Sequence, residues 1–429
     1  MQWIGSAKGL GNVPTPEINT ASAASDERRS PANGNRKRPR VRRGKLWFRI
    51  HSLVGLNLSL LIGLICLTGT LAVFASEVDW LMTPSIRAAQ PVALDDTNWQ
   101  AIAASLAEHA PDDAIDTIET GPSSAFAPAA YTGMPDGGRR VIRFDPATGV
   151  VQGEHSTLGF KSLLRAIHSH LLIGGPGLTI VTLTAFFLLA SLVTALFAYR
   201  RWWRGFFRWP QRHRGARVFW GDFHRLAGLW SLVFGFVVAL TGIWYFAEQN
   251  GVRAPAPDRP ALSAAKVGNV EAAAYFPKAL AAAHAAYPDL AIRRIDWPGR
   301  AGEVFAFYGQ EGTVLVRPRA NAAAVDVRSG DIAFTHSGSD AGVHRRISEA
   351  ADPLHMGYFA GFWSKLLWFL SGALLTIVAV SGAIVYAKRL AGEGDGHVRL
   401  RNLAITLALP LMTIGAMVAL LPGTIAALG

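Results

Sequence analysis

The chain has 429 residues, of which 50% are hydrophobic and only 17% are charged. A typical soluble domain carries about 25% charged residues, so this composition indicates a membrane protein. The net charge is +12, and short runs of Lys and Arg supply most of the excess. The single cysteine, Cys66, lies inside an apolar segment. An intramolecular disulfide and a thiolate metal cage are therefore both excluded.

The N-terminal segment, residues 1–45, is polar, rich in Pro, Gly, Ser and Asn, and ends in the basic run RKRPRVRRGK. This composition predicts a disordered cytoplasmic tail. Basic runs also occur in proteins that bind nucleic acid, but a basic run directly before an apolar segment favours orientation by the positive-inside rule. We therefore expect a lipid bilayer, and no nucleic acid, as the partner of this part of the chain.

Five apolar segments predict membrane-spanning helices, because about 20 apolar residues cross the hydrocarbon core of a bilayer. The four core spans and a fifth, C-terminal span are expected at 46–80, 164–200, 221–247, 351–389 and 400–422. Pro410 should kink the fifth span. Clusters of Lys and Arg place the N-terminus and the loops 201–220 and 390–399 on the cytoplasmic side.

Two inserts of water-soluble character lie between core spans. Residues 81–163 connect the first and second spans, and residues 248–350 connect the third and fourth. Each insert is predicted to contain a helix, alternating strands and a turn of the type D-x-x-(T/S)-G. Both halves of the chain thus have the order span, insert, span, which predicts a parallel internal repeat. The predicted fold class is a membrane α-helical bundle with two small α+β inserts in the periplasm.

One histidine stands near the end of each core span. His51 and His224 lie at the cytoplasmic ends of the first and third spans, and His168 and His355 lie at the outer ends of the second and fourth. A lone histidine at a membrane interface usually serves as an amphipathic anchor. Four histidines at matched positions instead predict two bis-histidine haem b sites, because neutral imidazole is a good axial ligand for haem iron.

His170 is an alternative to His168. Two residues apart on a helix, their side chains point about 200° apart, so only one of them can face a given neighbour. Small residues near the four positions would let helices part or a macrocycle edge approach the backbone, namely Gly55, Gly174, Gly228, Gly357 and Gly361. Three arginines are expected to pair with haem propionates, namely Arg49, Arg165 and Arg225.

The position of the outer haem depends on the start of the second span. A straight helix from His168 to Tyr199 would be about 46 Å long at 1.5 Å per residue, so the outer haem would lie above the hydrocarbon core. The sequence Gly174-Gly175-Pro176 predicts a break that would shorten this path. In the second insert, His336 and His344 are candidates to approach an outer substrate.

Four motifs support a family resemblance. They are HSLVGL…LTGTLAVF…EVDW, IHSHLLIGGPG, FHRLAGLW…ALTGIWY and LHMGYFAGFW…LWFLSGALL. Over about residues 47–390 the chain resembles the PepSY-associated transmembrane family, which includes iron-regulated membrane proteins and siderophore-iron reductases of the ferrioxamine type. The resemblance implies PepSY-like inserts, a haem-carrying membrane core, and His168 rather than His170 as the ligand. Thr194-Ala195, where the family usually has Thr-Gly, leaves the subfamily open.

This resemblance implies a haem b protein of the bacterial inner membrane, with a cytoplasmic N-terminus, that passes electrons to the periplasm. There it would reduce ferric chelates such as ferric siderophores and release Fe(II), which hard oxygen ligands hold less tightly. A cytoplasmic reductase or quinol would donate the electrons, since the sequence has no dinucleotide fingerprint. The alternative is a non-redox, membrane-anchored protein that binds peptide or regulates a peptidase.

Overall fold

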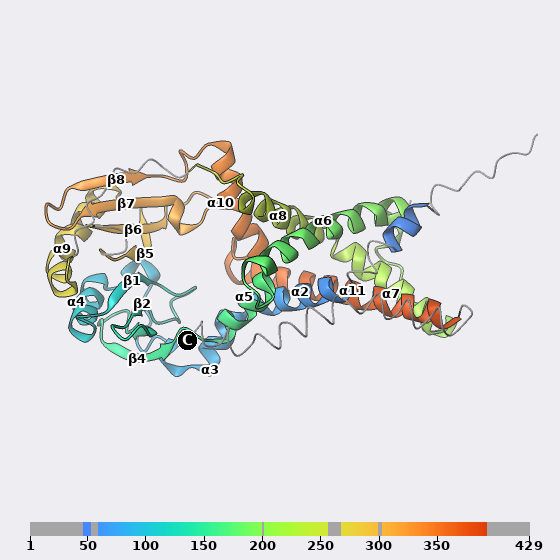
Figure 1. The fold of residues 1–429 in the computed structure, drawn as a ribbon, viewed down its shortest axis with the longest axis horizontal. Helices are drawn as coiled ribbons and strands as arrows, with labels where there is room; N and C mark the ends of the chain where they lie inside the picture. Colours follow the sequence, from blue (N-terminus) through green and yellow to red (C-terminus); the bar gives the residue numbers. More distant parts are fainter. Residues whose placement is uncertain (1–45, 53–58, 200, 256–266, 299–302, 393–429) are drawn as a thin grey trace, which may run out of the picture. The chain divides into compact units, whose positions relative to one another are not determined.

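The computed structural model describes residues 46–52, 59–199, 201–255, 267–298 and 303–392 (Figure 1). The basic tail, Gly55 and the predicted fifth span lie outside these residues. The described elements divide into a β-sheet with its covering helices, and a second group of helices that includes the long apolar ones. Each half of the chain contributes to both.

All named strands belong to one antiparallel sheet with the order β4-β3-β2-β1-β5-β6-β7-β8. The strands are β1 (Ala114–Glu119), β2 (Ala129–Gly133), β3 (Arg139–Phe144), β4 (Val151–Ser156), β5 (Ala291–Asp296), β6 (Val304–Gln310), β7 (Asn321–Asp326) and β8 (Ile332–His336). The two halves meet where β1 pairs with β5 and Ile118 lies opposite Ile295. The two inserts therefore build one continuous sheet.

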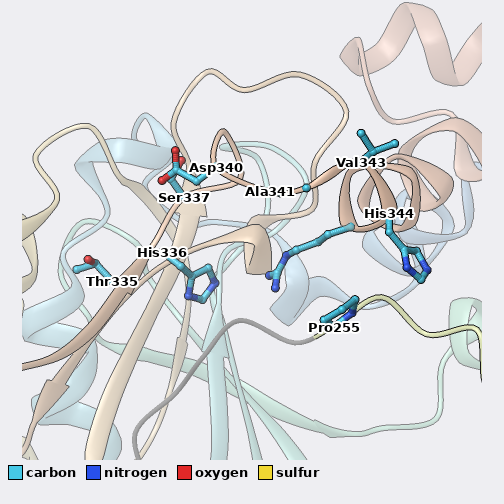
Figure 2. A pocket seen from close by; sticks show the side chains of 10 residues that line it. Pro255, Thr335, His336, Ser337, Asp340, Ala341, Val343 and His344 are labelled. Atoms are coloured by element: carbon cyan, nitrogen blue, oxygen red, sulfur yellow. The ribbon is translucent and has the colours of Figure 1, made fainter.

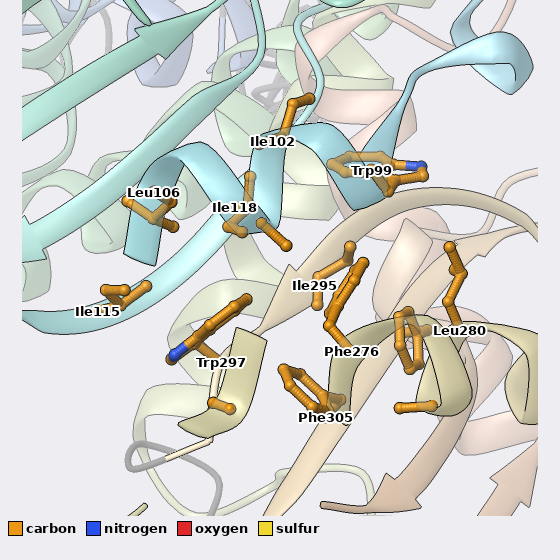
Figure 3. Packing of buried hydrophobic residues seen from close by; sticks show 14 of the residues in the cluster. Trp99, Ile102, Leu106, Ile115, Ile118, Phe276, Leu280, Ile295, Trp297 and Phe305 are labelled. Carbon is orange, nitrogen blue, oxygen red and sulfur yellow. The ribbon is translucent and has the colours of Figure 1, made fainter. Parts of the chain in front are cut away.

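Two helices that contact each other pack into one core with this sheet, α4 (Trp99–His109) from the first half and α9 (Asn269–Ala286) from the second. Apolar side chains of the helices and the strands fill this core (Figure 3). The rings of Phe276 and Trp297 both lie edge-on to Phe305, with centroids 5.2 and 5.1 Å away. Such aromatic pairs add about 0.5–1.5 kcal/mol each to the stability that burial provides.

The other described helices are α2 (Ser59–Ala72), α3 (Ala75–Met82), α5 (Phe160–His170), α6 (Gly175–Ala198), α7 (Ala216–Trp230), α8 (Leu232–Gln249), α10 (Val343–Met356) and α11 (Gly361–Gly392). Short 3₁₀ turns complete the described elements, at Pro84–Ile86, Leu94–Asp96, Trp202–Gly205, Arg212–Arg214 and Pro318–Ala320. α11 packs against α2 and α7, and α6 packs against α8. Helices from the two halves therefore interleave.

Within the described residues, three helices are long and apolar enough to cross a membrane. They are Gly175–Ala198, Leu232–Gln249 and Gly361–Tyr386. The number rises to four if α2 and α3, which meet at a bend of 57°, form one span. These helices agree with a membrane protein.

The predicted fold class is wrong. The chain is a mixed helix-and-sheet protein with three, or up to four, candidate spans in its described part, and not a helical bundle of four or five spans with two small inserts. The break predicted at Gly174-Gly175-Pro176 is confirmed, because α5 ends at His170 and α6 begins at Gly175. Leu171 and Leu172 adopt the left-handed conformation and separate α5 from α6. Apolar composition did not reveal the other breaks in the helices. The pairing of β1 with β5, which merges the inserts, also leaves no local trace in the sequence.

Candidate functional site

The structure brings the four predicted histidines together as two pairs. The rings of His51 and His224 have centroids 6.3 Å apart, with an interplanar angle of 63°. The rings of His168 and His355 have centroids 6.2 Å apart, with an angle of 48°. Each pair joins one histidine from the first half of the chain to one from the second. The candidate site therefore lies at the interface between the repeats, where such folds commonly place their sites.

In the first pair, Nδ1 of each ring is held by a backbone carbonyl of another helix. His51 Nδ1 lies 3.0 Å from the carbonyl oxygen of Ser191 on α6. His224 Nδ1 lies 2.9 Å from the carbonyl oxygen of Val378 on α11. Because a carbonyl can only accept, Nδ1 must carry the proton in both rings.

The second pair repeats this arrangement. His168 Nδ1 lies 2.9 Å from the carbonyl oxygen of Ile65 on α2. His355 Nδ1 lies 2.7 Å from the hydroxyl oxygen of Thr241 on α8. That hydroxyl donates its own proton to the carbonyl of Val237, so it accepts from the histidine. Nδ1 is thus the donor in all four rings.

This choice of tautomer leaves a lone pair on each Nε2. Every hydrogen bond that the four rings make within the described residues uses Nδ1. A histidine that binds a metal commonly donates its other ring N–H to a carbonyl or similar acceptor, which fixes the ring and raises its basicity. The Nδ1 contacts of the four histidines are therefore those expected of metal ligands.

The spacing within each pair fits two axial ligands of one iron ion. An imidazole nitrogen binds a first-row metal at about 2 Å, and the ring centre lies about 1.1 Å further back. Two rings on opposite sides of one ion then have centroids about 6 Å apart, close to the separations of both pairs. Each pair would supply two ligands, and a porphyrin would supply the other four. The residues present thus fit a haem at each pair.

A hydroxyl residue followed by a small residue lies beside each histidine on a neighbouring helix. The hydroxyl oxygens lie 2.7–3.4 Å from Nδ1. The four dipeptides are Thr194-Ala195 for His51, Thr68-Gly69 for His168, Ser381-Gly382 for His224 and Thr241-Gly242 for His355. We did not predict these contacts from the sequence. Their signal was a hydroxyl residue followed by a small residue, a pair that occurs at least once in each core span.

The chain matches the sequence profile described as PepSY-associated TM region over residues 48–389. The chain belongs to this family. The uncharacterized protein PA4219 of Pseudomonas aeruginosa is 38% identical over 85 residues, which are 19% of this chain. The match spans only 21% of that relative's length. The predicted family is confirmed, and this PepSY-associated protein is a membrane protein.

The break between α5 and α6 positions His168 in this PepSY-associated protein. Leu171 and Leu172, which end α5, are buried in a cluster with Leu61 of α2. α5 therefore packs against α2 and brings His168 beside it, and no straight helix runs from His168 to Tyr199. Asp79 of α3 fixes the other end of α5, because its carboxylate accepts from two backbone N–H groups, those of residues 160 and 161, at 2.7 and 3.0 Å.

His170 makes a different set of contacts. Its Nδ1 lies 2.6 Å from the hydroxyl of Ser169 on the same helix. Burial and the charge of Arg165 both lower the pKa of His170. The ring that lies against His355 is that of His168. The geometry therefore favours His168 as the ligand candidate of this helix.

The arginines predicted to pair with propionates have varied surroundings. Arg49 and Arg165 are exposed. Arg225 donates to Asp222 at 2.6 Å and to the carbonyl of Arg208 at 3.0 Å. Its Nε is buried without a hydrogen-bond partner in the described part of the chain. Arg225 thus has an unused donor near the His224 end of α7.

The small residues predicted to make room for a macrocycle mostly allow helices to begin or end. Gly174, Gly357 and Gly361 have φ values of 67°, 77° and 60°, so they end or begin helices in conformations that side chains disfavour. Gly357 also lies against Trp368. A Cβ atom added at position 357 would be 2.4 Å from Cγ of the tryptophan. Gly228 lies near Val378, with 3.8 Å between an added Cβ and that side chain.

A buried ionic network joins the sheet to the outer histidine pair. Arg317, between β6 and β7, donates to Glu349 at 2.7 Å and to Asp352 at 2.8 Å. Asp352 also accepts from the hydroxyl of Tyr245, whose ring centroid lies 5.3 Å from that of His355. Burial alone would lower the pKa of Arg317, but the bonds to both carboxylates raise it above the usual range. The sequence offered no signal for this network.

Proposed function

We propose that this protein is a haem b membrane protein that carries electrons from the cytoplasmic to the outer side and there reduces a ferric chelate. One observation carries the proposal. Two histidine pairs share a centroid separation near 6 Å, and in all four rings Nδ1 is held as a donor while Nε2 has no partner among the described residues. Imidazole pairs with this geometry suit low-spin haem.

His51 and His224 would hold one haem, and His168 and His355 the other. Bound haem supplies a one-electron redox centre at each pair. The residues of the chain orient the imidazoles through their Nδ1 bonds, and the apolar side chains of the surrounding helices exclude water. Two glycines make room for the rings themselves, since Gly69 and Gly382 lie directly against His168 and His224.

We propose the bacterial inner membrane as the location, with the N-terminus in the cytoplasm. The arginines around the 3₁₀ turns Trp202–Gly205 and Arg212–Arg214 support this orientation by the positive-inside rule. They are Arg201, Arg204, Arg208, Arg212 and Arg214. A cytoplasmic reductase or quinol would supply the single electron that converts Fe(III) to Fe(II). A siderophore or a similar hard oxygen chelator then holds the reduced ion less tightly.

The test is an optical spectrum of the full chain purified in detergent, oxidised and then reduced with dithionite. We expect the reduced α-band of low-spin haem b and about two haems per chain by pyridine haemochrome. His51→Ala and His355→Ala should each remove about one haem, and the double variant about both. His170→Ala is the matched control and should keep the full spectrum.

A colourless protein after expression with ample haem would overturn this proposal. Loss of haem in His170→Ala, with full retention in a His168→Ala variant, would reassign the outer ligand. In the colourless case the sheet would become the place to search for the non-redox alternative, which is binding of peptide or regulation of a peptidase.

A further inference from the structure

A cavity of about 450 Å³ lies where the end of β8 leads into the start of α10 (Figure 2). Ligand pockets for small molecules usually have volumes of about 300–1,000 Å³. His336 and Ser337 line the β8 side, and His344 and Arg345 line the α10 side. The close-up shows the two imidazole rings with Pro255 between them (Figure 2). The cavity belongs to neither histidine pair described above.

Donor groups dominate the lining of this cavity. Arg345 contributes a permanent positive charge and the two histidines contribute imidazole nitrogens, whereas Asp340 is the only acidic residue among the ten that line it. His344 Nε2 is buried and has no hydrogen-bond partner within the described residues. Among the described residues no side chain caps the N-terminus of α10, so the positive end of that helix adds to the field. The cavity suits an anion.

The cavity is also connected to the outer histidine pair. α10 begins at the cavity with Val343 and carries His355 in its last turn. His344 and His355 are about 16 Å apart along the helix at 1.5 Å per residue, well below the roughly 30 Å of a hydrocarbon core. The network of Arg317, Glu349 and Asp352 holds this helix against the sheet. A molecule in the cavity would thus lie one rigid helix away from His355.

We infer that this cavity binds the ferric chelate, and that it selects anionic, carboxylate-rich chelates over neutral or cationic hydroxamate chelates. The inference rests on the proposed reduction of ferric chelates and adds the site and the substrate class. Arg345 and the His344 Nε2 group bind carboxylate oxygens of the chelator. These oxygens lie on the surface of the chelate, whereas the iron is enclosed within it. Asp340 weakens binding by repelling the same oxygens.

The experiment measures binding by calorimetry with the full, haem-loaded chain in detergent. The probes are ferric citrate, iron-free citrate and a neutral ferric trihydroxamate. We expect ferric citrate to bind more tightly than both other probes. Arg345→Gln and His344→Ala should each weaken its binding about tenfold or more, as expected when a charge-assisted hydrogen bond is lost. Asp340→Asn should tighten it.

Two further variants separate this site from general effects of charge. Arg345→Lys keeps the positive charge and should retain most of the binding. Arg328→Gln removes one positive charge at the β7–β8 turn, where Arg328 pairs with Glu303 and Glu271, and should leave binding unchanged. Wild-type affinity in both Arg345→Gln and His344→Ala would overturn the inference. Equal binding of citrate with and without iron, or tighter binding of the hydroxamate, would also overturn it.

The two proposals fail in different ways. The haem spectrum should be the same in every cavity variant, because none of these residues lies in a histidine pair. A colourless protein whose ferric citrate binding still depends on Arg345 would refute the electron-transfer function and support the binding site. A coloured protein that binds ferric citrate independently of Arg345 and His344 would support the haem proposal and refute the binding site.

Discussion

Gly69 of α2 lies so close to the ring of His168 that a Cβ atom at position 69 would be 2.6 Å from Cε1 of the imidazole. Atoms do not approach so closely in folded proteins, so any side chain here would displace the ring. This contact gives a physical reason for the Thr68-Gly69 dipeptide. The threonine lies within 3.4 Å of Nδ1, and the glycine leaves space for the ring.

We predict that Gly69→Ala displaces His168 and weakens the outer haem site. Changes in the residues that orient a metal ligand commonly cost about 10- to 100-fold in metal affinity, and we expect a loss in that range at one of the two sites. The haem content of the purified variant, titrated with haem, measures this loss. Gly63→Ala on the same helix is the control, because its added Cβ would meet Ala379 at an ordinary 3.5 Å. Equal haem affinity in both variants would contradict the prediction.

Thr241→Val should affect the outer site more than Thr68→Val. His355 relies on the Thr241 hydroxyl at 2.7 Å, whereas His168 keeps the carbonyl of Ile65 at 2.9 Å when the Thr68 hydroxyl is lost. We expect Thr241→Val to lower haem affinity at this pair about tenfold or more, with a shift in its midpoint potential. Thr241→Ser should restore both values. Potentiometric titration followed in the α-band measures them, and the same shift in Thr68→Val would refute this account.

Arg317→Gln should destabilise the protein strongly. The change removes the guanidinium that bridges the buried carboxylates of Glu349 and Asp352, and breaking a buried ion pair costs about 3–5 kcal/mol. Arg319→Gln is the matched control, because Arg319 is 60% exposed and lies 3.6 Å from Glu349, where an ion pair contributes about 1 kcal/mol or less. Thermal unfolding of both variants in detergent compares them. Similar losses would show that the network is not a structural link.

Asp145 should make stability depend on acid pH. Burial raises the pKa of Asp145, but hydrogen bonds from Thr148, Gln90 and Ala147 outweigh it and lower the pKa. A carboxyl group with a lowered pKa stabilises the fold fully above its unfolded pKa of about 4, and this contribution is lost as the pH falls through the lower folded value.

We therefore predict that Asp145→Asn lowers the unfolding temperature at pH 7 and that its difference from the wild type shrinks below about pH 4. Thermal unfolding of the full chain at pH 7 and near pH 3 checks this prediction. Asp136→Asn is the control, since Asp136 is exposed and accepts one backbone hydrogen bond, from Gly138 at 2.9 Å. A difference for Asp145→Asn that persists unchanged into acid would rule out the linkage.

Several local features could be predicted from the sequence. The D-x-x-(T/S)-G turns form as expected, with Gly149 and Gly330 at φ values of 73° and 76°. Asp145 and Asp326 each accept backbone N–H groups within their own turn. Such turns depend on residues adjacent in the chain, so a few sequence positions determine them.

The candidate site could be predicted only in part. The positions of His51, His168, His224 and His355 at matched ends of apolar segments suggested two pairs, and haem ligation by them stays a prediction. The partners of Nδ1 could not be predicted, because Ser191, Val378 and Ile65 contribute backbone carbonyls that carry no side-chain signature. Thr241 was visible in the sequence, but not its contact with His355.

By itself, the sequence determined the apolar segments, the repeat of the two halves, the local turns and the family. Only the tertiary structure decided that β1 pairs with β5 to form one sheet, that α5 packs against α2 beside His168, and that Arg317 connects the sheet to α10. The reason is physical. Composition and periodicity report on the environment of neighbouring residues, whereas these contacts depend on the packing of segments that are distant in the chain.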